Sequence, residues 1–121
     1  MNKFYLILAL ALALLGQGLR AETYKLTAYC PCVRCCGDFP GKIRGQTSSG
    51  AMATAGRTLA AAKGVPYGTV VVAVVDGRRE VVGVVEDRGG AIKERRLDLY
   101  FNTHQEALNF GVQFVEIELL D

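Results

Sequence analysis

Residues 70–88 read VVVAVVDGRREVVGVVEDR, and this stretch decides the fold class. Two valine-rich runs, 70–75 and 79–85, flank Asp76-Gly77, and Asp-Gly between two such runs is a strong signal for a β-hairpin. Both runs are apolar at nearly every position, as in strands that are covered on both faces or wrapped into a small barrel. The hairpin therefore predicts a mainly β fold.

The rest of the chain adds strands and one helix. Alternation of apolar and polar residues predicts further strands at 23–29, 96–101 and 113–120, and we also expect a short strand at 57–62. Thr103-His104-Gln105-Glu106 matches a capping box, and Gly111 stands where a helix would end, so we expect one short helix between them. Residues 30–56 show no period and predict one long, ordered loop. About six strands and one short helix predict a compact β-barrel.

The N-terminal segment predicts export. Lys3 is followed by an apolar run from Phe4 to Leu15 and then by small and polar residues, which is the pattern of a secretory signal peptide. The run is shorter than the roughly 20 residues of a membrane span. We expect cleavage after residues 1–21, no permanent membrane span, and a domain of residues 22–121 in the periplasm, the cell envelope or outside the cell. The alternative is an uncleaved helix that tethers the domain.

The charge balance excludes one class of partner. Removing Lys3 and Arg20 from the 14 basic residues leaves 12, which equals the 12 acidic residues. A domain without net charge has no electrostatic footprint for nucleic acid, so we expect no nucleic-acid partner.

The four cysteines lie within seven residues, at Cys30, Cys32, Cys35 and Cys36. In an oxidising compartment two short-range disulfides are the expected state. Four thiolates could instead hold zinc, but four ligands so close in sequence leave awkward geometry for metal bonds of about 2.3 Å. We therefore expect disulfides, no metal and no cofactor.

Carboxylates are the candidate catalytic groups. The single histidine, His104, falls in the first turn of the predicted helix, where we expect an exposed structural role, and this leaves no Ser-His-Asp set. Asp87 follows the most hydrophobic strand, and Asp98 stands inside another strand eleven residues later. Two interpretations of Asp87 and Asp98 stay open. They are either ion-paired structural residues or the acids of a catalytic site.

Six short segments, in their order and spacing, resemble the three-aspartate (3D) domain family. They are 27–32 with 35–37, 47–50, 66–69, 85–93, 97–101 and 103–108. The resemblance covers nearly all of the chain after the N-terminal segment. It implies a six-stranded double-psi β-barrel crossed by a groove, and a role in cell-wall turnover.

The family is similar to the catalytic barrel of membrane-bound lytic transglycosylase A and to small stationary-phase muralytic proteins. Those enzymes cleave the β-1,4 bond between N-acetylmuramic acid and N-acetylglucosamine and leave a 1,6-anhydro sugar. The resemblance implies an exported enzyme of this type that acts on peptidoglycan glycan strands, with Asp98 as general acid and base and Asp87 as the supporting carboxylate. The matching segments also imply substrate-binding residues, which are Ser49, Glu86, Arg88, Gly89, Gly90, Lys93 and Tyr100.

Two positions depart from the family pattern. Ala62 and Lys63 stand where the first of the three aspartates belongs, and Glu94 and Arg95 replace the usual Gly and Asn. The missing aspartate is the best support for an alternative to the enzyme, a non-catalytic glycan-binding or wall-organising barrel. A structural secreted domain without a sugar ligand is a third interpretation.

Overall fold

The predicted hairpin is present in the computed structural model, which describes residues 21–37, 41 and 43–121. β3 (Val70–Val75) and β4 (Arg78–Arg88) pair antiparallel. Asp76 and Gly77 both have positive φ, 51° and 75°, as a type I′ turn requires. β4 runs beyond the predicted 79–85 because Asp87 and Arg88 pair with a further strand. Residues 1–20 of the predicted signal peptide lie outside the described residues.

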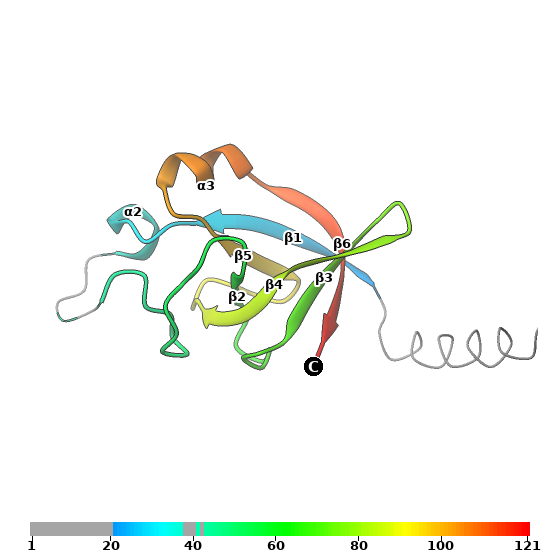
Figure 1. Cartoon of the computed structure of the whole chain (residues 1–121), viewed down its shortest axis with the longest axis horizontal. Helices are drawn as coiled ribbons and strands as arrows, with labels where there is room; N and C mark the ends of the chain where they lie inside the picture. Colours follow the sequence, from blue (N-terminus) through cyan, green and yellow to red (C-terminus); the bar gives the residue numbers. More distant parts are fainter. Residues whose placement is uncertain (1–20, 38–40, 42) are drawn as a thin grey trace, which may run out of the picture.

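Six strands close into one barrel (Figure 1). The remaining four are β1 (Glu22–Tyr29), β2 (Thr58–Ala61), β5 (Arg96–Tyr100) and β6 (Gln113–Leu120). The hydrogen-bonded order is β1-β5-β2-β4-β3-β6, and β6 pairs with β1 to close the ring. The pairs β1–β5 and β2–β4 are parallel, and the other pairs are antiparallel. The predicted mainly β fold with six strands is confirmed.

The core lies inside this ring, and every strand contributes to it. One buried core residue from each strand is, in chain order, Leu26, Leu59, Val71, Val85, Leu97 and Ile117. Side chains alternate between the two faces of a strand, so the neighbours of these residues point outward. This alternation puts Asp98 of β5 on the outer face of the barrel. Asp87 stands two residues after the buried Val85, and the register shift between β2 and β4 at Leu59 and Ala60 brings it opposite Ala60 on that same face.

Among the described residues, two short helices lie outside the barrel. α3 (His104–Phe110) is the predicted helix, since Thr103 Oγ1 accepts the Glu106 N–H at 3.2 Å and Gly111 follows the last turn with a φ of 68°. α2 (Val33–Cys36) adds a turn to the segment expected to be loop, because four residues are too few to show a helical period. The expectation of one helix was therefore wrong. No helix in the described part of the chain is long and apolar enough to cross a membrane.

Candidate functional site

Barrel pairing brings the two predicted catalytic aspartates onto one face. Ala60 of β2 pairs with Asp87 of β4 on one side and with Asp98 of β5 on the other, and Asp98 in turn pairs with Thr27 of β1. Residues directly opposite one another on neighbouring strands share a face. Asp98 lies between Leu97 and Leu99, which pack in or against the core, so that face is the outer one. We call Thr27, Asp98, Ala60 and Asp87 the carboxylate row.

Asp87 is held by three hydrogen-bond donors. The hydroxyl of Tyr29 donates to its Oδ2 at 2.8 Å. The backbone N–H groups of Ser48 and Arg88 both donate to its Oδ1 at 2.9 Å. These contacts come from β1, the loop before β2 and β4 itself, so the orientation of the Asp87 carboxylate is fixed from three sides. An acceptor surrounded by donors in this way suits a supporting role.

Asp98 has a different environment from Asp87. Thr27 Oγ1 donates to its Oδ1, and the same threonine oxygen accepts from Arg96 Nε at 3.1 Å. Arg96 Nη2 lies 3.9 Å from Asp98 Oδ2, and the Asp98 side chain is 15% exposed. Asp98 therefore keeps some access to solvent while a hydroxyl and a guanidinium orient it. It lies two inter-strand spacings, roughly 10 Å, from Asp87 across β2.

A pocket opens beside Asp87, and two tyrosines form part of its wall. The residues that line it are Tyr29, Pro31, Cys36, Gly37, Arg44, Gly45, Gln46, Thr47, Ala53, Asp87 and Tyr100. The rings of Tyr29 and Tyr100 meet edge to face with centroids 5.5 Å apart. Burial, followed by the Asp87 carboxylate, raises the pKa of Tyr29 far above its ordinary value, and burial also raises that of Tyr100. Of the predicted catalytic and substrate-binding residues, Asp87 and Tyr100 are in this lining and Asp98 is not.

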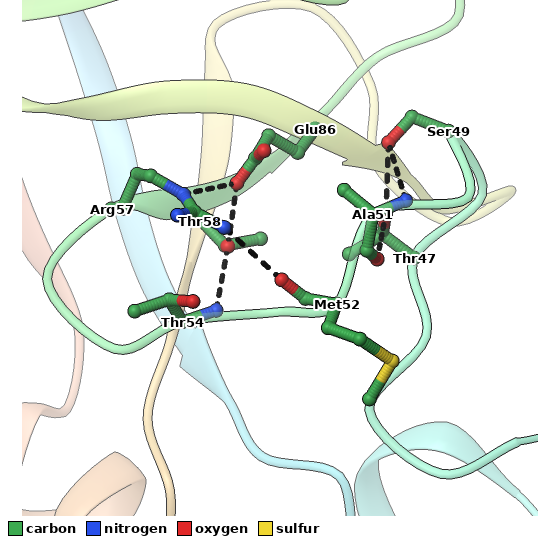
Figure 2. Close-up of polar contacts among 8 residues, drawn as sticks. All are labelled: Thr47, Ser49, Ala51, Met52, Thr54, Arg57, Thr58 and Glu86. Carbon is green, nitrogen blue, oxygen red and sulfur yellow. Dashed lines mark hydrogen bonds and ion pairs between the residues drawn. The ribbon is translucent and has the colours of Figure 1, made fainter.

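Two predicted substrate-binding residues, Glu86 and Ser49, belong to a hydrogen-bond network of the loop before β2 (Figure 2). Glu86 Oε1 accepts from Arg57 Nε at 2.9 Å and from Thr58 Oγ1 at 2.8 Å. Ser49 Oγ lies 2.9 Å from Thr47 Oγ1, and its backbone N–H donates to the Glu86 carbonyl at 3.3 Å. These contacts fasten the loop to β4, and thereby position the Ser48 N–H on Asp87.

The other predicted substrate-binding residues lie at the end of β4 and in the turn after it. The Arg88 guanidinium lies 3.9 Å from the centroid of the Tyr67 ring, and its Nη2 donates to the Val65 carbonyl at 3.0 Å. Gly90 and Lys93 are exposed, and Gly89 packs against Ile92. Arg88 therefore connects the end of β4 to Val65 and Tyr67, and Lys93 is open to solvent.

The structure puts a small side chain at the position of the missing aspartate. Ala62 directly follows β2 and is half-buried, and Lys63 beside it is exposed. Both residues line a second pocket, together with Arg95 and Arg96, which has neither Asp87 nor Asp98 in its lining. The described residues supply no third aspartate beside the carboxylate row, so the row carries two carboxylates.

The two predicted disulfides are not present in the structure. Cys30 Sγ lies 2.9 Å from Cys32 Sγ and 3.4 Å from Cys35 Sγ, whereas a disulfide bond is about 2.05 Å long. The hydrogen bond from Cys30 lowers the pKa of Cys32 to about 6, and burial raises that of Cys30 to about 12. The remaining thiol, that of Cys36, donates instead to the Cys30 carbonyl at 3.2 Å.

His104 is the functional candidate that sequence reasoning missed. We expected an exposed helix residue, but His104 is half-buried and its Nδ1 lies 3.4 Å from Cys32 Sγ, 3.6 Å from Cys35 Sγ and 3.7 Å from Cys30 Sγ. These four side chains are the group in the described residues that could hold a metal ion. The histidine stands 74 residues after Cys30, so no local spacing in the sequence signals the cluster.

Comparison with known proteins gives one family and one fold. A family model described as the 3D domain matches residues 57–121, which is more than half of the chain. A search of the curated proteins finds no match. The family match covers β2 to β6, and therefore both aspartates of the carboxylate row.

Solved structures of MltA from Escherichia coli have a similar fold. An Asp-to-Ala variant of the E. coli lytic transglycosylase MltA, in an apo form, superposes with a TM-score of 0.52 at 22% identity. A crystal structure of MltA from E. coli gives a TM-score of 0.51 at 23% identity. Each match covers 63% of this chain and 27% of the MltA chain, so the present chain spans about a quarter of the length of these structures. At this identity the likeness concerns the fold.

Proposed function

Because the chain belongs to the 3D domain family, we propose that it is an exported, lytic transglycosylase-like enzyme that cleaves the β-1,4 bond between N-acetylmuramic acid and N-acetylglucosamine in peptidoglycan. The observation that carries the proposal is the carboxylate row, in which Asp87 and Asp98 flank Ala60 on one outer face. The similar MltA structures are named as those of a lytic transglycosylase, which supports the choice of reaction. The parallel pairs β1–β5 and β2–β4 support a double-psi topology for the barrel.

In the proposed reaction Asp98 acts twice. Its protonated carboxyl donates the proton to the glycosidic oxygen while the bond between C1 and that oxygen breaks. The resulting carboxylate then takes the proton of the sugar's own C6 hydroxyl as that oxygen bonds to C1. The reaction consumes no water, so one acid suffices where a hydrolase uses two carboxylates. The product ends in a 1,6-anhydro ring.

Thr27 and Arg96 suit these two steps. The Thr27 hydroxyl can donate to the carboxylate form of Asp98 and accept from the protonated form, so it can orient the group before and after the proton leaves. The Arg96 Nη2 lies 3.9 Å from Asp98 Oδ2, where it can contact the oxygen that the first step leaves without its proton. Thr27 and Arg96 are therefore positioning residues for Asp98.

Asp87 has a separate task in this proposal. Its three donors hold its oxygens in one orientation beside the Tyr29–Tyr100 pocket. A fixed negative group stabilises the positive charge that develops on the sugar ring in an oxocarbenium-like transition state. Tyr29 and Tyr100 in the lining of the adjacent pocket would give the glycan an aromatic surface to contact.

Analysis of the digestion products tests the proposal. Incubated with purified cell-wall sacculi, the protein is expected to release soluble muropeptides that end in anhydro-N-acetylmuramic acid, identified by mass spectrometry. Products with a reducing end would replace the transglycosylase by a hydrolase. Release of no product, whatever the binding, would refute an enzymatic function.

One observation favours a second candidate function, a non-catalytic glycan-binding or wall-organising module. Ala62 stands where the family has its first aspartate, so a carboxylate that could tune or assist Asp98 is missing. A protein that sediments with sacculi and releases nothing would select this function. The same two measurements, sedimentation and product release, therefore separate the two candidates.

A further inference from the structure

Three sulfur atoms and one ring nitrogen meet outside the carboxylate row. The sulfurs belong to Cys30, Cys32 and Cys35, the nitrogen is His104 Nδ1, and all four atoms lie within 4.8 Å of one another. Figure 1 shows the elements that bring them together, with α2 and the start of α3 at the end of β1. Cys30 follows β1, Cys32 caps α2, Cys35 lies in α2, and His104 opens α3.

The distances fit a tetrahedral ion. With Zn–S bonds of about 2.3 Å and a Zn–N bond of 2.0–2.1 Å, a tetrahedron has S···N edges of roughly 3.5 Å and S···S edges of roughly 3.8 Å. The three S···N distances in the structure are 3.4, 3.6 and 3.7 Å. The sulfurs of Cys30 and Cys35 are 3.4 Å apart. To hold the ion, the Cys30–Cys32 distance of 2.9 Å must open by about 0.9 Å, and the Cys30–Cys35 distance by about 0.4 Å.

A histidine as fourth ligand avoids the awkward geometry that we expected from four cysteine ligands within seven residues. Four cysteines within seven residues leave awkward geometry, but only three of them converge here. The Cys36 thiol donates to the Cys30 carbonyl, and His104, which is distant in the sequence, supplies the fourth ligand atom. One disulfide would use two of these groups and would give no reason for a third sulfur and a ring nitrogen to point at the same place.

We propose that Cys30, Cys32, Cys35 and His104 form a closed zinc site that fastens α3 to the segment after β1. Three thiols release their protons and bind as thiolates, and the neutral imidazole binds through Nδ1, so no oxidation or reduction is involved. A soft thiolate-rich tetrahedral set selects zinc over the hard cations magnesium and calcium. Because protein atoms fill all four corners, the site is structural and leaves no position for a substrate.

The site would also shape the candidate active site. Pro31, Cys36 and Gly37 lie within or directly beside the ligand segment, and they line the pocket that contains Asp87. A metal that fixes residues 30–36 to α3 therefore fixes one wall of that pocket. The inference does not depend on the proposed enzymatic function, since a glycan-binding barrel would gain the same rigid wall.

Metal analysis of the whole chain tests the proposal. The protein, purified in zinc-containing medium without chelator, is expected to contain one zinc ion per chain. Replacement by cobalt should give the visible bands of tetrahedral cobalt together with thiolate-to-cobalt charge transfer in the near ultraviolet. All four thiols should react with a thiol reagent after chelation and denaturation without a reductant.

Single substitutions locate the ligands. His104→Ala and Cys35→Ser each remove one ligand and should lower zinc affinity more than about 100-fold, since loss of even an outer partner costs 10–100-fold. Cys36→Ser is the matched control and should keep one zinc ion, because the Cys36 thiol contacts a carbonyl instead of the cluster.

Three results would overturn the zinc site. The first is a wild-type chain without stoichiometric metal. The second is a mass lower by two hydrogens for each disulfide, with correspondingly fewer reactive thiols. The third is a loss of zinc in Cys36→Ser equal to that in His104→Ala. If a ligand variant does not fold, the metal content and cobalt spectrum of the wild-type chain decide the question.

Discussion

At the scale of single residues, Tyr29 connects the two strands that carry the proposed chemistry. Its hydroxyl donates to Asp87 at 2.8 Å, and its ring packs edge to face on Tyr100, two residues beyond Asp98. Burial and the Asp87 carboxylate both oppose ionisation of the phenol, and they raise the pKa of Tyr29 well above the ordinary 10.0. This residue therefore links the stability of the fold to pH.

We predict that the free energy of unfolding falls less steeply at alkaline pH in Tyr29→Phe than in the wild type. Below pH 10 the phenol is protonated in the folded and the unfolded chain, whereas above pH 10 only the unfolded chain releases its proton. The free energy of unfolding of the wild type should therefore fall as the pH rises above 10, and that of Tyr29→Phe should fall less. Urea unfolding at several pH values measures the difference, and parallel curves would contradict the prediction.

The same substitution has an effect at neutral pH. Tyr29→Phe removes one hydrogen bond to a carboxylate, while the Ser48 and Arg88 N–H groups remain. We expect a loss of about 1.5 kcal/mol in the free energy of unfolding, the lower end for a hydrogen bond to a charged group. An unchanged stability at pH 7 would mean that solvent replaces the tyrosine at Asp87.

At the scale of elements, β4 depends on a glycine at its close approach to the loop before β2. A Cβ atom built on Gly83 would lie 2.3 Å from the Arg57 carbonyl oxygen, and that oxygen also accepts the Val84 N–H at 2.7 Å. The carbonyl cannot move away without losing this bond. The absence of a side chain at Gly83 lets β4 lie against the Arg57 backbone. The Arg57 side chain in turn donates to Glu86 in the loop network (Figure 2).

Gly83→Ala is therefore expected to destabilise the protein by about 1–3 kcal/mol, the usual range for an overpacked site. Gly90→Ala serves as the matched control, because a Cβ atom there meets nothing within 4 Å. The control should stay within about 0.5 kcal/mol of the wild type. Urea unfolding of the three proteins provides the comparison, and equal stability of the two variants would show that the strand adjusts freely.

The helix α3 depends in the same way on Thr103, the residue that caps its N-terminus. Thr103→Ala removes the side chain that caps the Glu106 N–H and should cost about 1 kcal/mol, whereas Thr103→Ser keeps the hydroxyl and should cost little. Thermal or urea unfolding of both variants measures the difference. A Thr103→Ser variant as unstable as Thr103→Ala would assign the effect to packing instead of capping.

The sequence could predict elements whose signals are local. The Asp76-Gly77 turn, the capped helix and the strand β6 follow from neighbouring residues and are present as predicted. The turn α2 and the last residues of β4 were not predicted. α2 is too short for a period, and Asp87 joins the strand only because β2 lies beside it.

At the scale of the whole molecule, closure of the barrel assembles both sites from remote segments. Thr27 and Asp98 are 71 residues apart in sequence, and Cys30 and His104 are 74 residues apart. Alternation in the sequence could place Asp98 on the polar face of its strand, but it could not show that β2 separates it from Asp87. The resemblance to the family supplied the roles of the two aspartates, and neither it nor the residue spacing predicted the convergence of His104 on the cysteines.

The account as a whole depends on Asp98 as the single acid and base of a glycan-cleaving barrel. Its most direct test is the rate of muropeptide release from sacculi by wild type, Asp98→Asn and Asp76→Asn. Asp76 is exposed in the β3–β4 turn at a positive φ that asparagine also adopts, so Asp76→Asn controls for the loss of one negative charge. We expect Asp98→Asn to release product at least about 100-fold more slowly, with unchanged circular dichroism, and Asp76→Asn to match the wild type. Equal rates for Asp98→Asn and the wild type would contradict the account.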